Sequence, residues 1–260
     1  MRGSLDWNDC LGRTALSLAA ENGHADVVEL LMQAGANIEA STKYEETPIS
    51  WAVMNEHADV VDLLEKTGVN VEVPDTEYGR TPISWAAMNG HADVVELLMQ
   101  AGANIEASPK YGGTPISWAA LNGHADVVEL LMKAGAKVEV TDTQYEQTPI
   151  SWAAMNGHAD VVKLLIKAGA KVEVTDTQYE QTPISWAAKN GHADVVELLM
   201  KAGANIEVLD KDGKTPIWSA ATHGKADVVE LLMKAGANAE VVDKWGHTPI
   251  SLLAIIEYVD

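Results

Sequence analysis

The chain has 260 residues, of which 47% are hydrophobic and 22% are charged, a composition typical of a folded, soluble protein. Its 38 acidic residues outnumber its 18 basic residues and leave a net charge of -20. Nucleic acids and anionic membranes bind basic surfaces, so this charge argues against both kinds of partner. The start, MRGSLDWNDC, has no apolar signal core, and we expect a cytoplasmic protein.

A repeat with a period of 33 or 34 residues runs along the chain. Its most similar copies, 141–162 and 175–196, differ at one position, where Met155 is replaced by Lys189. A fixed period of this length predicts a stack of similar units in place of separate globular domains. The threonine that opens TPIS, or a variant of it, recurs at Thr14, Thr47, Thr81, Thr114, Thr148, Thr182, Thr215 and Thr248.

Each repeat predicts two short helices and a loop. In the copy TPISWAAMNG, Thr81 can cap a helix whose first turn accepts Pro82, and Gly90 ends that helix. A second helix is predicted through HADVVELLMQ and ends before Gly102. The polar stretch that leads to the next Thr-Pro carries turn residues, which predict a hairpin-like loop.

The stretch GRTPISWAAMNGHADVVELLMQAGANIEA resembles the ankyrin repeat, whose pattern is a Gly-x-Thr-Pro-Leu-His-x-Ala-Ala opening, then Gly-His and a Val/Leu-rich second helix. Ser84 stands where that family usually has His, and Trp85 follows it. The resemblance runs from Asp9 to about Tyr258. It implies an all-α ankyrin-repeat solenoid of antiparallel helix pairs with projecting hairpin-like loops, and a concave surface built from loops and first helices.

We expect residues 1–260 to form a single ankyrin array. The expected repeats span about 8–40, 41–73, 74–107, 108–140, 141–174, 175–208 and 209–241, and a truncated C-terminal cap spans 242–260.

The resemblance also implies a class of function, because ankyrin proteins mostly bind other proteins and do no chemistry. We therefore expect a non-enzymatic scaffold, without cofactor or metal, for a protein or peptide ligand of unknown identity. The near-perfect copies leave a second interpretation open, an engineered structural repeat scaffold without an evolved partner.

A stripe of aromatic and long apolar residues is the candidate binding surface. Helical rotation places Trp85 and Met88 opposite Ile83, whose side is predicted to pack against neighbouring helices. The corresponding first-helix residues are Trp51, Trp85, Trp118, Trp152 and Trp186, followed three positions later by Met54, Met88, Leu121, Met155 and Lys189. The loops add Tyr44, Tyr78, Tyr111, Tyr145, Tyr179 and Trp245, with the variable residues Lys110 and Arg80 beside them.

Two interpretations of this stripe remain open. Aromatic residues beside Met and Leu are typical of adaptable protein-binding surfaces. The same Trp and Tyr recur so regularly that they could instead be framework residues that bridge adjacent repeats. The single difference between the best copies, Met155 against Lys189, falls on the stripe and favours a partner-reading role.

Columns of histidine and carboxylate residues do not predict chemistry. Equivalent residues in stacked helices stand about 8–10 Å apart, too far to share a metal ion or a proton. Glutamates recur from Glu39 to Glu240 at the repeat period, and we expect a solvated outer face. In water, each adjacent pair at that spacing would repel by about 0.4 kcal/mol before screening, so the column should cost some stability.

Several glutamates stand where other repeats have glycine. Glu56 replaces a helix-ending glycine, and Glu45, Glu146 and Glu180 replace a loop glycine. Because residues other than glycine resist a positive φ, these positions predict either a different turn or backbone strain. The extra loop residue of the 34-residue repeats offers a way to relieve Glu146 and Glu180.

The last stretch, TPISLLAIIEYVD, supplies a first helix without a second. Leu252, Ile255 and Ile256 take the outward positions, whereas terminal repeats normally present a polar outer face. We therefore predict a weak homodimer through the C-terminal cap.

Overall fold

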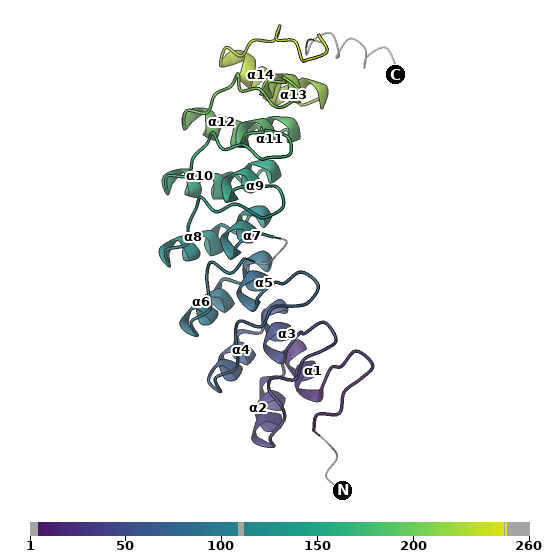
Figure 1. Ribbon diagram of the computed structural model, residues 1–260. Helices are drawn as coiled ribbons and strands as arrows, with labels where there is room; N and C mark the ends of the chain where they lie inside the picture. Colours follow the sequence, from purple (N-terminus) through teal and green to yellow (C-terminus); the bar gives the residue numbers. More distant parts are fainter. Residues whose placement is uncertain (1–4, 109–111, 247, 249–260) are drawn as a thin grey trace. The chain divides into compact units, whose positions relative to one another are not determined.

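The computed structural model describes residues 5–108, 112–246 and 248. The described residues form fourteen α-helices joined by loops, and they contain no strand beyond one isolated bridge between Asn8 and Thr14 (Figure 1). The predicted all-α class is confirmed. None of the helices in this part of the chain has the length and apolar character needed to cross a membrane. The chain divides into two compact units, residues 1–119 with 126–137, and residues 120–125 with 138–260.

The first unit contains two layers of helices, and each first-layer helix also packs against the helix that follows it in sequence. The first part of α7 (Pro115–Asn122) and most of α8 (Ala125–Lys133) belong to this unit. The first layer is α1 (Ala15–Glu21), α3 (Pro48–Met54) and α5 (Pro82–Asn89), and the second layer is α2 (Ala25–Gln33), α4 (Ala58–Glu65) and α6 (Ala92–Gln100).

The second unit repeats this arrangement of two layers, with each first helix again paired with its successor. Its first layer is α9 (Pro149–Asn156), α11 (Pro183–Asn190) and α13 (Pro216–Thr222), and its second layer is α10 (Ala159–Lys167), α12 (Ala193–Lys201) and α14 (Ala226–Lys234).

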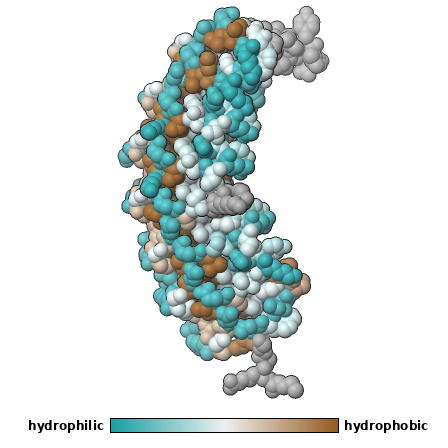
Figure 2. Space-filling model, viewed as in Figure 1, coloured by the Kyte–Doolittle hydropathy of each residue, from teal (hydrophilic) through white to brown (hydrophobic). Residues whose placement is uncertain are grey.

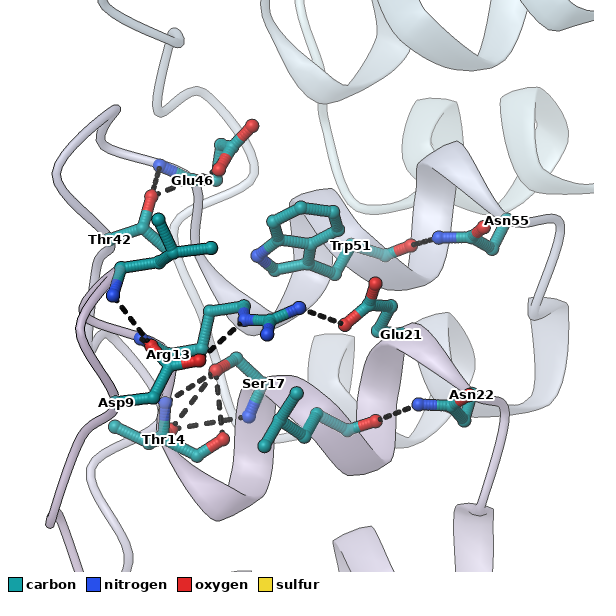
Figure 3. Close-up of polar contacts among 12 residues, drawn as sticks. Asp9, Arg13, Thr14, Ser17, Glu21, Asn22, Thr42, Glu46, Trp51 and Asn55 are labelled. Atoms are coloured by element: carbon teal, nitrogen blue, oxygen red, sulfur yellow. Dashed lines mark hydrogen bonds and ion pairs between the residues drawn. The ribbon is translucent and has the colours of Figure 1, made fainter.

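The first helices begin directly after the recurring threonine, as the sequence predicts, but the Thr81 hydroxyl makes no cap bond in α5, so the expected cap is wrong there. In α1, the Thr14 hydroxyl accepts a bond from the Ser17 backbone N–H at 3.2 Å, and the Ser17 hydroxyl accepts one from the Thr14 N–H at 2.7 Å (Figure 3). This reciprocal box satisfies two donors that a helix start otherwise leaves unpaired. The C-terminal end of α5 is set by Gly90, which adopts a φ of 80°, a left-handed conformation that costs glycine little.

The core lies between the two layers and between successive repeats. Ile83, Ala86 and Ala87 of α5 are fully buried, as are Val94 and Leu98 of α6. The small alanines allow the first helices to approach closely, while the branched side chains of α6 fill the space behind them. The side of α5 that carries Ile83, which the sequence predicts to pack against neighbouring helices, is therefore the buried side of this helix.

The glutamate column lies on the outside but does more than the sequence predicted. Glu106 Oε1 accepts a bond from the backbone N–H of Lys137 at 2.8 Å, and so joins its repeat to the next one. These carboxylates therefore also hold successive repeats together, a contribution that the sequence analysis did not include. The same bond recurs from Asn70 to Glu39, Asn104 to Glu72, Lys171 to Glu139, Asn205 to Glu173 and Asn238 to Glu207.

The histidine column also links repeats. His158 Nε2 lies 3.0 Å from the Leu121 carbonyl at the end of the preceding first helix. The ring packs on Gly123, where an added Cβ would lie 2.5 Å from His158 Nδ1. Glycine is therefore required there for close approach as well as for its positive φ of 81°.

Glutamates at glycine positions keep the glycine conformation. Glu45, Glu56, Glu146 and Glu180 have φ between 53° and 61°. The idea that an extra loop residue relieves Glu146 and Glu180 is therefore wrong, since the insertion leaves both in the left-handed region. These four positions store backbone strain.

Two groups of predictions fall outside the described residues. Lys110 and Tyr111 are one group, and the apolar cap residues Leu252, Ile255 and Ile256 are the other.

Candidate functional site

The candidate site is a strip of side chains that we call the first-helix strip, considered separately in each unit. It comprises the first-helix Trp, the residue three positions later, the loop aromatic and the residue just before each Thr-Pro. Half-buried members are Trp51, Trp85, Trp118, Trp152, Met54, Met88, Leu121, Met155, Lys189, Tyr145, Tyr179 and Arg80, while Tyr44, Tyr78 and Trp245 are exposed. Trp186 is buried, with 7% of its surface exposed.

Buried aspartates hold the loops and tryptophans of the strip in place, a role that the sequence analysis missed. Asp75 accepts bonds from the Tyr78 N–H at 2.5 Å, the Arg80 N–H at 3.2 Å and the Trp85 indole N–H at 3.0 Å. Asp176 makes the equivalent bond to the Trp186 indole at 3.1 Å. An aspartate that precedes a short polar turn is the available signal, because its carboxylate can cap the turn's own backbone.

Arg80 is the centre of the strip in the first unit. Its guanidinium carbon lies 4.4 Å from the Tyr78 ring centroid, 4.8 Å from that of Trp85 and 4.5 Å from that of Trp118. Burial lowers the pKa of Arg80, and the nearby Asp75 carboxylate opposes that shift. Nε of Arg80 is buried without a hydrogen-bond partner, so the stacking on the rings compensates for lost hydration.

Lysines take a similar place in the second unit. Lys189 Nζ lies 4.8 Å from the Trp186 ring and 5.7 Å from the Tyr179 ring, and Lys211 Nζ lies 4.3 Å from Tyr179. Tyr179 and Trp186 meet edge to face, with centroids 5.8 Å apart. Lys189, Lys211 and Tyr179 line a cavity of about 400 Å³, together with Lys214 and Trp218.

In the first repeat the same positions form an ion pair. Arg13 precedes Thr14 as Arg80 precedes Thr81, and its guanidinium binds Asp9 at 2.9 Å and Glu21 at 3.3 Å. Figure 3 shows Trp51 of α3 on the same side of the helices as this pair.

The strip offers aromatic faces, flexible apolar side chains and a few charges, groups that are common in protein-binding surfaces. Figure 2 colours the loop side mostly hydrophilic or neutral, whereas hydrophobic residues come to the surface over the helices. Among the described residues, no group of three or more His, Cys, Asp or Glu side chains is placed to hold a metal ion.

Helix pairs joined by loops, with a glutamate bond from each pair to the next and histidine bonds between several of them, define a stacked-repeat solenoid. Residues 2–75, 67–142 and 141–210 match the family model for three ankyrin repeats, and residues 212–244 match the model for a single ankyrin repeat. The chain belongs to the ankyrin-repeat family, as its sequence predicted. Ankyrin repeats indicate a protein-interaction scaffold.

A solved structure agrees with this assignment. The crystal structure of the human ASB11 ankyrin repeat domain is similar to this chain, with a TM-score of 0.79 and 26% sequence identity. The similarity covers 87% of this chain and 99% of that one. No curated protein matches the chain.

Proposed function

We propose that the chain is a non-enzymatic, cytoplasmic scaffold that binds a protein or peptide through the first-helix strip. One observation carries the proposal. On helices whose Ile and Ala residues are fully buried, Trp85, Trp118 and Trp152 remain half-exposed although their positions are fixed by packed helices. Large rigid aromatics at the surface provide contact area at a low cost in conformational entropy.

The variable positions support the same proposal. Lys189 is half-exposed and not enclosed in the core, so its site tolerates both a charge and the apolar Met155 of the neighbouring copy. A pure framework position would have to bury that charge. The indole bonds to Asp75 and Asp176 tie Trp85 and Trp186 to their own loops, and in the proposal this framework role is combined with partner contact through the exposed ring faces.

The proposal treats residues 1–260 as one array with the repeat boundaries given above. A weak homodimer through the cap at 242–260 stays a prediction of the sequence, since most of that cap lies outside the described residues. The acidic surface favours a partner other than nucleic acid or a membrane.

A peptide-library selection against the immobilised full chain tests the proposal. For selected peptides, Met88→Ala and Tyr145→Ala should each weaken binding about fivefold or more, because the minority of interface residues that carry the binding energy cost more than about 1 kcal/mol each when truncated. Both variants should melt within about 2 °C of the parent, since they remove exposed or half-exposed groups.

The matched control is Lys133→Ala, which changes an exposed residue on a second helix and should leave binding unchanged. Binding that depends on Lys133 but not on Met88 or Tyr145 contradicts the proposed strip. A library that yields no saturable binder supports the other interpretation, a structural scaffold without a partner.

A further inference from the structure

Each of the two near-identical copies in the second unit contains a Tyr–Trp pair. The copies differ in whether a cation of the chain lies over this pair. In the copy with Lys189, the chain's own ammonium lies over Trp186, which is buried. In the other copy, Tyr145 and Trp152 also meet edge to face, with centroids 6.4 Å apart, but Met155 replaces the lysine and Trp152 is half-exposed.

Cations of the chain lie over several other aromatic side chains of the first helices and loops. Arg80 lies over the rings of Tyr78, Trp85 and Trp118. Lys214 lies 4.4 Å from the Trp218 ring. Of the two edge-to-face Tyr–Trp pairs in the described part of the chain, only Tyr179–Trp186 has such a cation.

A buried acceptor lies beside the uncovered pair in sequence. Gln147 is 4% exposed, and its Oε1 has no hydrogen-bond partner. It occupies the position of Arg80 and Lys214, the residues that place their cations over the tryptophans. A guanidinium brings five N–H donors, and Gln147 Oε1 is the unpaired acceptor that lies closest in sequence to this aromatic pair.

We propose that Tyr145, Trp152 and Gln147 form a subsite for a cationic side chain, best an arginine, of a basic peptide segment in the partner. This inference rests on the proposed function and names the partner's chemistry. The net charge of -20 draws such a segment toward the chain. The ring faces then bind the cation as the rings of the next copy bind Lys189.

The chain supplies its own matched variants. Met155→Lys should fill the subsite with an internal cation and block it. Lys189→Met should uncover Trp186 and create a second subsite, since Gln181 offers the same buried, unpaired Oε1 as Gln147. Lys211 remains over Tyr179, so this second subsite should be the weaker one.

The test uses the full chain labelled with ¹⁵N at its tryptophan indoles and the peptide acetyl-Gly-Ser-Arg-Ser-Gly-amide. The control peptide has citrulline, which is neutral and nearly the same shape, in place of arginine. The arginine peptide should shift the Trp152 resonance, assigned with Trp152→Phe, saturably and about tenfold more tightly than the citrulline peptide.

Met155→Lys should abolish that shift, and Lys189→Met should add a shift at Trp186. Equal shifts with the citrulline peptide, or an undiminished shift in Met155→Lys, overturn the subsite. If no indole moves in any variant, the subsite is also wrong. Library-selected peptides that depend on Met88 and Tyr145 would then still support the scaffold, so the two proposals fail separately.

Discussion

Glu56 shows how one side chain disturbs a repeating contact. At the equivalent positions, glycine lets the next repeat's histidine ring come close, and His57 and His158 lie 3.0 Å from their carbonyl partners. His91 faces Glu56 instead, and its Nε2 lies 3.4 Å from the Met54 carbonyl. Its Nδ1 lies 3.5 Å from the carboxylate of Glu56, whose side chain is exposed.

Glu56→Gly should therefore stabilise the chain. It removes a left-handed conformation at φ 61° and clears the space beside His91. We expect a gain of about 0.5–1 kcal/mol in the free energy of unfolding, because glycine adopts this conformation freely but is more flexible when unfolded. Chemical denaturation of parent and variant measures the difference.

Two further variants distinguish the backbone conformation from the carboxylate charge as the cause of the expected stabilisation. Glu56→Ala removes the carboxylate but keeps the Cβ and the strain, so it should bring little or no gain. Gly123→Glu makes the reverse change beside His158 and should destabilise the chain. Stabilisation by Glu56→Ala equal to that by Glu56→Gly would assign the effect to the charge and not to the backbone.

At the scale of the element, the loop that follows each second helix is tied to its neighbour by a glutamate. Glu106 is half-exposed, and its bond to the Lys137 N–H connects two backbones that belong to successive repeats. A stacked array has few long-range contacts besides those between neighbours, so each such bond contributes directly to the cohesion of the stack.

Glu106→Ala should lower the free energy of unfolding by about 0.5–1.5 kcal/mol, the usual contribution of a hydrogen bond. Glu96→Ala is the control. Glu96 is exposed on α6, and its substitution removes the same charge. Denaturation curves of the two variants give the comparison. If Glu96→Ala costs as much as Glu106→Ala, the inter-repeat bond contributes nothing measurable.

The sequence predicted the helices well because their signals are local. Thr81, Pro82 and Gly90 mark the limits of α5 within the repeat, and the position of Ile83 relative to Trp85 follows from helical rotation alone. The roles of Asp75 and Glu106 were missed because they depend on which backbone lies nearby in space. The cation over a given tryptophan likewise depends on where a neighbouring loop places its side chain.

At the scale of the whole molecule, charge is the dominant unbalanced feature. Acidic residues exceed basic ones by 38 to 18. The exposed i,i+4 ion pairs, such as Lys133 with Glu129 and Lys201 with Glu197, are solvated. Pairs of this kind contribute about 0.3–0.5 kcal/mol each and weaken in salt. The excess carboxylates, each repelling its neighbours by about 0.4 kcal/mol at ~10 Å, oppose them.

Because repulsion outweighs these pairs, salt should stabilise the chain. At about 0.5 M NaCl the Debye length falls to roughly 4 Å, shorter than the spacing between repeats, so most of the repulsion is screened. We expect the melting temperature to rise by a few degrees between about 0.05 and 0.5 M salt, followed by circular dichroism. KCl should give the same rise, since screening depends on ionic strength and not on the cation. A melting temperature that falls with both salts would show that the ion pairs and the glutamate bonds between repeats outweigh the repulsion.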